Sequence, residues 1–230
     1  MKFYKILNEK ECHNGLQYKT GLNVDPLAFN PKGTCEPGGI YYTQKDILAF
    51  LRYGPWIREV VIPDDAQVYK DPDENPEKWK ANKVVLRKRR RITPEVVEEL
   101  IKEGADACAD GNEALHWAST NGRIEIIKAL LENGANVHAE DDRPLRYAAA
   151  YGHTGTVKLL LENGADVHAW DDYALRWASY NGNTETVKVL LENGADVHAR
   201  NGEALKGASI NGHTKIVKLL KEWMEKENTK

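Results

Sequence analysis

Two thiols and an imidazole near the N-terminus are the side chains best suited to bind a metal ion. Cys12, His13 and Cys35 are residue types that ligate zinc. However, Cys12 and His13 are adjacent, and two adjacent side chains rarely point at one ion; the short spacing between paired cysteines that marks zinc sites is also absent. With Cys108, the chain has three widely spaced cysteines, which imply no disulfide framework. We therefore expect neither a metal ion nor another cofactor.

Histidines and aspartates recur along the second half of the chain. Six of the seven histidines lie there: His116, His138, His153, His168, His198 and His213. Packed helices lie about 8–10 Å apart, so equivalent imidazoles of stacked units are too distant to share an ion held at about 2 Å. Asp141-Asp142 and Asp171-Asp172 recur in segments typical of turns, which favour aspartate. No phosphate loop, serine elbow or HExxH run is present. We expect no catalytic residue.

These residues belong to a repeat with a period of 30. Residues 141–170 read DDRPLRYAAAYGHTGTVKLLLENGADVHAW, and residues 171–200 read DDYALRWASYNGNTETVKVLLENGADVHAR. Rows starting at residues 111 and 201 align with them without gaps, and residues 92–110 match the second half of a row. Self-similarity at such a period is typical of stacked units that bury their apolar faces against one another.

Each row predicts two short helices. A glycine such as Gly152 is placed to end the first helix in the left-handed conformation, and Thr154 is placed to cap the start of the second. Val157 and Leu160 then give an apolar stripe at helical spacing. The half-row opens with Thr93-Pro94, a capping hydroxyl followed by a first-turn proline.

The rows resemble the ankyrin family, through the first helix and the run GHT…VKLLLENGADVHA, over about residues 92–230. The amino-acid sequence of the rows is similar to that of giant-virus members of the family. The resemblance implies an all-α solenoid of four 30-residue repeats plus an N-terminal half-repeat, and a role in protein binding. Ankyrin repeats usually run to about 33 residues. The missing residues fall between Ala169 and Leu175, the segment that forms a projecting finger in the family. In this chain that segment is short and lacks a glycine.

Residues 1–91 lack the repeat and predict a small α+β domain. Strands are expected in the segments 3–7, 16–24, 40–42, 57–62 and 83–87, a turn at 11–15, a short helix at 45–52, and loops at 30–33, 36–39 and 71–77. The runs LQYKTGLNVD, FNPKGTCEPGGIYYT and IREVVIP resemble a module of giant-virus repeat proteins, and this resemblance implies no activity. The domains are therefore expected to be 1–91 and 92–230.

An enzymatic alternative rests on His13-Asn14-Gly15 and Gly38-Gly39-Ile40-Tyr41-Tyr42, which resemble the histidine and tyrosine elements of ADP-ribosyltransferases. About 90 residues is small for that fold, and no acidic third element stands at a suitable place. If residues 1–91 catalyse a reaction, His13 and Tyr41 should converge in a concave, polar pocket, with the repeats selecting the substrate. A flat or filled surface there favours binding alone.

Charge and hydropathy bear on partners and location. Residues 1–91 contain 17 Lys and Arg against 12 Asp and Glu, whereas residues 92–230 contain 15 against 23. No apolar run approaches the roughly 20 residues that span a bilayer. We expect an intracellular, cytoplasmic protein (in the host cytoplasm if viral). Arg87-Lys88-Arg89-Arg90-Arg91 could direct nuclear import or contact nucleic acid, but a solvated linker or a contact with the acidic solenoid is favoured.

The expected partner-binding residues are those that vary inside the repetitive frame. Exposed Tyr, Trp and Arg side chains most often anchor interfaces. We expect the following residues to line the concave face: Arg143, Tyr151, Trp170, Tyr173, Tyr180, Asn181, Arg200 and Ile210. Trp117, Tyr147 and Trp177 share one repeat position and predict either packing between repeats or ligand contact. The expected partner is a protein, of host or viral origin, with no membrane, nucleic acid or small molecule, and the chain is expected to be a monomer.

Overall fold

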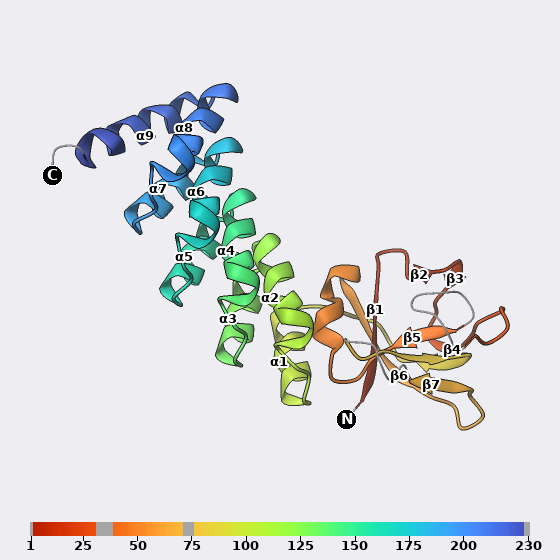
Figure 1. The fold of residues 1–230 in the computed structure, drawn as a ribbon. Coiled ribbons are helices and arrows are strands. Elements are labelled where there is room, and N and C mark those ends of the chain that lie inside the picture. Colours follow the sequence, from red (N-terminus) through yellow and green to blue (C-terminus); the bar gives the residue numbers. More distant parts are fainter. Residues whose placement is uncertain (1, 31–38, 71–75, 228–230) are drawn as a thin grey trace. The chain divides into compact units, whose positions relative to one another are not determined.

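The computed structural model describes residues 2–30, 39–70 and 76–227. It consists of two compact units, Met1–Ala114 and Leu115–Lys230 (Figure 1). The first unit includes the whole strand-rich region and the first helix of the repeats. The domain boundary expected between residues 91 and 92 stays a prediction.

The repeat region is helical, as predicted. The half-repeat is one helix, and each full repeat contributes two. The helices are α1 (Pro94–Lys102), α2 (Ala109–Thr120), α3 (Ile124–Glu132), α4 (Ala139–Ala150), α5 (Thr154–Glu162), α6 (Ala169–Tyr180), α7 (Thr184–Glu192), α8 (Ala199–Ile210) and α9 (Thr214–Glu227).

The helix ends confirm most of the predicted signals. Thr93 caps α1 by accepting a hydrogen bond from the Val96 amide at 3.4 Å, and Pro94 begins the helix. Gly152 follows α4 with a left-handed φ of 74°. The prediction that Thr154 caps α5 is wrong: His153 is the cap residue and makes no side-chain cap hydrogen bond. The Thr154 hydroxyl instead bonds the Thr186 hydroxyl of the next repeat at 2.8 Å.

In the second unit the helices form two layers. The first helices α4, α6 and α8 pack in one row, and the second helices α5, α7 and α9 pack in the other (Figure 1). Their facing side chains are almost completely buried, among them Leu145, Leu175, Val157, Val187 and Leu190. Each repeat thus covers the apolar face of its neighbour, as the sequence pattern predicted.

Polar bonds across the junctions between repeats set their register. His153 contacts the Thr120 carbonyl through Nε2 at 2.9 Å, and His213 contacts the Tyr180 carbonyl in the same way. Asn183 takes this position in the third repeat and donates to the carbonyls of Ala149 and Ala150. These contacts give the histidines at this position a structural role.

The strand-rich region contains two larger sheets and a hairpin, all antiparallel. Its elements are β1 (Phe3–Leu7), β2 (Cys12–His13), β3 (Leu16–Gln17), β4 (Gly21–Val24), β5 (Ile40–Tyr42), the 3-10 helix η1 (Ile47–Tyr53), β6 (Trp56–Val61), β7 (Val68–Lys70), β8 (Trp79–Ala81), β9 (Lys83–Leu86) and β10 (Arg90–Arg91). One sheet has the order β1-β6-β9-β4, with β10 also paired to β6; the other has the order β5-β8-β7.

A shared apolar core joins the two larger sheets. Leu7 and Leu86 come from one sheet, and Ile40 and Ala81 from the other. The α+β prediction is therefore confirmed, although the pairing of the early segments differs from the prediction. The expected strand at 16–24 is interrupted at Tyr18, which lies in the core, and the expected turn at 11–15 contains β2. The strands β7, β8 and β10 were not predicted. The loops expected at residues 31–33, 36–38 and 71–75 lie outside the described residues.

Within the first unit, α1 is bonded to the strand-rich region. Glu103, just after α1, accepts hydrogen bonds from Lys2 at 2.6 Å and from the Tyr4 hydroxyl at 2.5 Å. Arg90 of β10 pairs with Glu99 of α1 at 2.7 Å. The hydrogen bonds from Lys2 and Tyr4 lower the pKa of the Glu103 carboxyl. The half-repeat is thus part of a polar network with the strands that precede it.

Gly152→Ala should destabilise the protein more than Gly164→Ala. Both glycines have a left-handed φ, 74° and 92°, so alanine costs about 1 kcal/mol at either position. A Cβ on Gly152 would lie 2.7 Å from Oδ1 of Asn183, whereas one on Gly164 would have no described atom within 4 Å. The overpacking adds about 1–3 kcal/mol at Gly152 alone. Urea unfolding measures both; equal losses would contradict the proposed close contact between repeats.

Glu103→Gln should reduce the free energy of unfolding by about 1 kcal/mol at pH 7, because it weakens the charge-assisted bonds from Lys2 and Tyr4. The folded-state pKa of Glu103 is depressed, so its contribution is present above the unfolded value of about 4.5 and is lost as pH falls through the folded pKa. The difference between variant and wild type should therefore shrink as the pH falls below about 4.5 and vanish once the pH lies below the folded-state pKa. Glu98→Gln, in an exposed pair at 3.9 Å with Lys102, is the control and should change little.

Candidate functional site

The segment where the family's finger was expected is a left-handed turn. Trp170, Asp171 and Asp172 have φ values of 54°, 53° and 56°, and the right-handed part of α6 follows directly. The equivalent residues of the other repeats share this conformation: 110–112, 140–142 and 200–202. The segment is short, as predicted, but three consecutive left-handed residues were not expected. This backbone costs about 1 kcal/mol or more for each non-glycine residue.

A buried arginine holds the turn in the third repeat. Arg176, 8% exposed, donates from Nε to the Asp171 carbonyl and from Nη2 to the Trp170 carbonyl, each at 2.9 Å. Hydrogen bonds from a charged donor contribute about 1.5–3 kcal/mol each, so two of them offset the cost of the backbone. Arg146 makes the same two bonds in the second repeat, to Asp141 and Glu140.

A buried aspartate ties the same turn to the next repeat. Asp172, 4% exposed, accepts a hydrogen bond from the Asp196 amide at 2.7 Å and contacts His168 Nδ1 at 3.2 Å. Burial raises the pKa of Asp172, and the amide of Asp196 and the nearby His168 partly oppose that rise. The paired aspartates therefore serve the turn, in agreement with the expected structural role.

In the first and last repeats, the left-handed turn contains a glycine. Where the first and last repeats lack the arginine and have His116 and Lys206, their turns contain Gly111 and Gly202. Glycine adopts the left-handed region without a Cβ penalty, which lowers the cost of the backbone at one of the three residues in each of these turns. The two inner repeats have the arginine and the two outer repeats have the glycine.

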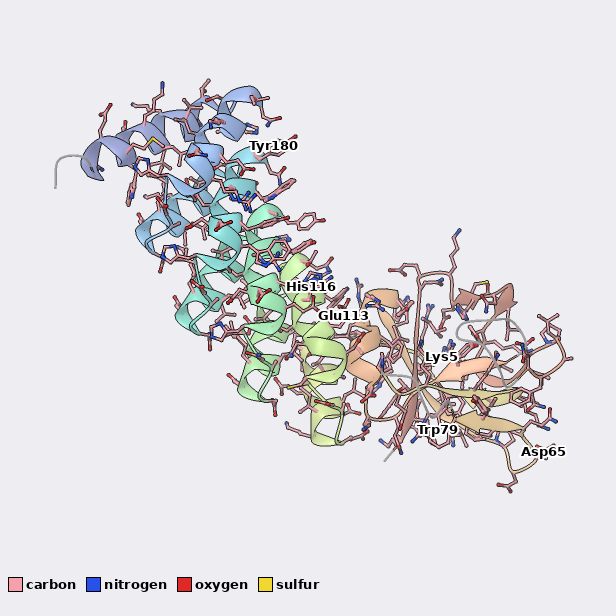
Figure 2. All side chains as sticks on the ribbon, viewed as in Figure 1. Lys5, Asp65, Trp79, Glu113, His116 and Tyr180 are labelled. Atoms are coloured by element: carbon pink, nitrogen blue, oxygen red, sulfur yellow. The ribbon has the colours of Figure 1, made fainter. Side chains whose placement is uncertain are left out.

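Several predicted binding residues are exposed on the first helices and their turns. Tyr151, Trp170, Tyr180 and Ile210 are 60%, 57%, 47% and 83% exposed. Figure 2 shows Tyr180 at the end of α6, on the side of the stack away from the second helices. These side chains form an apolar surface that nothing in the second unit covers among the residues described.

The predicted polar residues lie beside them but have partners within the chain. Arg143 pairs with Glu140 at 2.7 Å, and Arg200 pairs with Asp171 at 3.0 Å. Asn181 donates to the Ala150 carbonyl of the preceding repeat at 2.9 Å. All three side chains therefore have partners within the chain, although both ion pairs are solvent-exposed.

The aromatic rings of the third repeat contact one another in a row. Tyr173 stacks on Trp177 with ring centroids 5.6 Å apart, Trp177 lies 5.4 Å from Tyr180, and Trp170 meets Tyr173 edge-on at 6.2 Å. Trp177 is 38% exposed, and both of its aromatic partners among the described residues belong to its own helix, so the alternative between packing against a neighbouring repeat and ligand contact stays a prediction. A Cβ on Gly207, the counterpart of Trp177 in the last repeat, would lie 3.5 Å from Cδ2 of Tyr180, so a larger side chain there would contact that ring.

Arg146 links the rows of two repeats. Its guanidinium lies 4.3 Å from the ring centre of Trp170 and 5.3 Å from that of Tyr173. In the second repeat, Tyr147 stacks on Tyr151 at 6.5 Å. We call the six rings of Tyr147, Tyr151, Trp170, Tyr173, Trp177 and Tyr180 the aromatic surface. Arg146 and Arg176 were not predicted to organise this surface, since only their spacing from the turn could have indicated the role.

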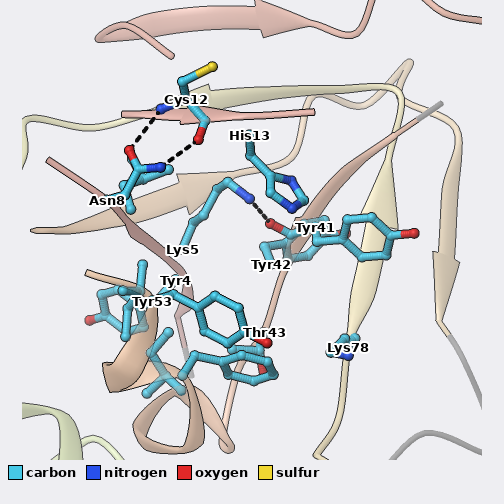
Figure 3. A pocket seen from close by; sticks show the side chains of 14 residues that line it. Tyr4, Lys5, Asn8, Cys12, His13, Tyr41, Tyr42, Thr43, Tyr53 and Lys78 are labelled. Atoms are coloured by element: carbon cyan, nitrogen blue, oxygen red, sulfur yellow. Dashed lines mark hydrogen bonds between the residues drawn. The ribbon is translucent and has the colours of Figure 1, made fainter. Parts of the chain in front are cut away.

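The strand-rich unit contains a cavity of about 110 Å³ (Figure 3). His13 and Tyr41 both line it, with ring centroids 6.2 Å apart and ring planes at 82°. Lys5, 7% exposed, donates to the Tyr41 carbonyl at 2.7 Å. Burial, and secondarily the charge of Lys5, lower the pKa of His13. The convergence required by the enzymatic alternative is present, but the remaining wall is largely aromatic and aliphatic.

The sequence predicts neither a zinc site nor a membrane-spanning helix. Among residues 2–30, 39–70 and 76–227, no three His, Cys, Asp or Glu side chains are grouped so as to hold a metal ion. Cys35 lies outside these ranges, whereas neither Cys12 nor Cys108 forms a disulfide with another described residue. In the same ranges, no helix has both the length and the apolar character needed to cross a bilayer.

The basic run 87–91 is partly engaged in the first unit. Arg89 lies over Trp56 at 4.4 Å and pairs with Glu11 at 3.2 Å. Arg90 and Arg91 form β10 against β6, and Arg90 pairs with Glu99. The run is therefore not a free linker along its whole length.

The stacked helical pairs are those of an interaction solenoid, and comparison with known proteins gives the family. A family profile for ankyrin repeats in three copies matches residues 88–171 and 145–230. These matches cover more than half of the chain, which belongs to the ankyrin repeat family. Ankyrin repeats support a role in protein interaction.

The relatives come from Acanthamoeba polyphaga mimivirus. One ankyrin repeat protein is 38% identical over 134 residues, which are 52% of this chain and 44% of the relative. A second is 36% identical over 128 residues, 54% of this chain and 63% of the relative. An uncharacterised protein of the same virus is 38% identical over 127 residues, 54% of this chain and 92% of its own length. The chain spans less than two thirds of the length of the two ankyrin relatives.

Arg176→Met should cost about 2–4 kcal/mol of unfolding free energy, because both carbonyl bonds that hold the left-handed turn are lost. Lys206→Met, at the same repeat position, should cost less than about 0.5 kcal/mol, because Lys206 is exposed and Gly202 forms that turn. Denaturant titration of both variants gives the comparison. Similar losses in the two would contradict the role assigned to the arginine.

Proposed function

We propose that the chain is a protein-binding scaffold whose partner, a host or viral protein, docks on the exposed side of the first helices. The observation that carries this proposal is the aromatic surface, with Ile210 beyond it in the last repeat. Exposed apolar groups that cluster in this way are typical of interaction sites. Tyrosine, tryptophan and arginine are also the residues that most often dominate binding energy.

The packing of the rings supports tight binding. Tyr173 and Trp177 stack on one another, and the buried Arg146 lies against Trp170 and Tyr173. Side chains that are already ordered lose little rotamer freedom when a partner binds. We infer that the arginine-clamped turns preorganise the surface and that a partner contacts the second, third and fourth repeats together.

We propose that the chain acts by binding and not by catalysis, as a monomer in the host cytoplasm. The enzymatic alternative finds support in the convergence of His13 and Tyr41. Against it stands the size of the cavity, about 110 Å³, where pockets for drug-sized ligands measure about 300–1,000 Å³. A substrate as large as a dinucleotide would not fit inside. The engagement of Arg89 and Arg90 with acidic partners likewise favours a structural role for the basic run over nuclear import.

The surface variant Tyr151→Ala/Tyr180→Ala/Ile210→Ala should lose its partner. We expect affinity capture with the whole chain from Acanthamoeba lysates, infected and uninfected, to recover specific proteins identified by mass spectrometry. Because anchoring side chains contribute about 2 kcal/mol or more each, capture by the variant should fall at least tenfold. All three residues are exposed, so the helical circular dichroism and the melting temperature should remain near those of the wild type.

The matched control is Lys158→Ala/Lys188→Ala/Lys218→Ala. These three exposed lysines share one repeat position on the second helices, on the other layer of the stack. The control should capture the partner as the wild type does. Undiminished capture by the surface variant, or an equal loss in the lysine control, would contradict the proposed docking side.

A further inference from the structure

Three aromatic side chains occupy one position in three successive repeats. Trp117 lies on α2, Tyr147 on α4 and Trp177 on α6, at intervals of 30 residues. Trp177 is 38% exposed, and the other two are half-buried. The helices that carry them pack side by side: α4 contacts α6, and the His116 ring of α2 meets Tyr147 edge-on at 5.0 Å. We call these three rings the aromatic ladder.

The spacing of the aromatic ladder follows from the stacking of the repeats. Neighbouring helices lie about 8–10 Å apart, so equivalent rings recur along the stack at about that distance. The ladder ends in the fourth repeat, where the equivalent residue is Gly207 and a Cβ would lie 3.5 Å from Cδ2 of Tyr180. The three repeats thus offer three aromatic contacts in a line, and the outer two lie about 16–20 Å apart.

The charged side chains beside the rings are matched within the chain. Three ion pairs lie on the first helices and their turns: Arg143–Glu140, Arg176–Glu203 and Arg200–Asp171. The guanidinium of Arg146 already lies over the Trp170 ring, 4.3 Å from its centre, so a further cation there would meet a like charge. Charge complementarity with such a surface requires a ligand that is itself uncharged and apolar.

Among uncharged peptide segments, the polyproline II helix matches the ladder one turn to one ring. It has three residues per turn and rises about 3.1 Å per residue, so one face recurs about every 9.3 Å. A β-strand repeats its face after about 6.6–6.8 Å, and an α-helix meets equivalent positions only at every second turn of about 5.4 Å. The polyproline II backbone also leaves its carbonyls unbonded, and the hydroxyl and indole groups of the ladder are suitable donors to them.

We propose that the segment of the partner that docks here is proline-rich and adopts a polyproline II helix, with every third residue against one ring of the ladder. This inference rests on the proposed function, because it names the chemistry of the segment that the exposed side of the first helices binds. Aromatic side chains are a general means of recognising such segments, and a preformed helix loses little entropy on binding. Three rings correspond to about seven residues of ligand.

Fluorescence anisotropy of labelled oligoprolines with the whole chain tests this proposal. Peptides of about three, six and nine prolines should bind with rising affinity, because they reach one, two and three rings. We expect the longest to bind at least about tenfold more tightly than the shortest, and than a glycine–serine peptide of equal length, which pays more entropy to become ordered. Because the ligand is uncharged, its affinity should change little as salt is added.

Tyr147→Ala and Trp177→Ala each remove one ring of the ladder. Each should weaken binding of the longest oligoproline about tenfold, since large aromatic side chains dominate such contacts. Lys158→Ala, at an exposed position on α5, is the control and should bind unchanged. Circular dichroism and the melting temperature show whether each variant is folded, and the comparison of peptide lengths on the wild type requires no variant.

Four results would overturn the proposal: no binding of the longest oligoproline, equal binding of all lengths, an affinity that falls steeply with salt, or unchanged binding by both folded variants. The proposed function is tested separately, by capture from lysates with the surface variant. Loss of capture by that variant, combined with no oligoproline binding, would leave the docking side in place and remove only the proline-rich ligand.

Discussion

The structure of the repeat region depends on the left-handed turn that precedes each first helix. A repeat of 30 residues leaves three residues to lead from one helical pair into the next, and in the third repeat they are Trp170, Asp171 and Asp172. Their backbone is unfavourable for residues with a Cβ. It is held because Arg176 bonds two of their carbonyls and Asp172 bonds the amide of Asp196 in the following repeat. The turn is therefore both a local structure and a junction between repeats.

The same interactions create the exposed surface. Because the turn projects no long finger, the first helices and the residues just before them remain open to solvent. Arg146 holds its own turn and also packs against Trp170 and Tyr173 of the next repeat. The residues that stabilise the stack thus also orient the rings that we propose as the docking surface. The strand-rich unit contributes a separate feature, a small cavity lined by His13 and Tyr41.

Much of the fold could be predicted because the repeat displays each signal several times. The period of 30, the apolar stripe and the helix-ending glycines give the helices directly, and Gly152 behaves as predicted. Thr154 does not cap its helix as predicted, because its hydroxyl hydrogen-bonds the Thr186 hydroxyl of the neighbouring repeat. The strands β7, β8 and β10 were missed because two or three residues show no alternation. Such short strands are specified by their partners in the sheet.

The sites were harder to predict than the fold. Exposure of Tyr151, Trp170, Tyr180 and Ile210 followed from their variation within a regular frame. The left-handed turn did not, because tryptophan and aspartate disfavour that backbone and the compensating arginine acts through tertiary geometry. His13 and Tyr41 converge, which the sequence analysis required only of the enzymatic alternative. The meeting of Lys5 and Lys78 with these two rings at one cavity depends on tertiary contacts that no local pattern reveals.

The most direct test of this account is the NMR cross-relaxation between the amide and α protons within residues 170, 171 and 172. Positive φ brings these two protons closer together than either an ordinary helix or a strand does. We expect strong intraresidue signals at all three residues in the wild type. Weak signals there, as in the right-handed residues of α6, would contradict the left-handed turn on which the proposed surface depends.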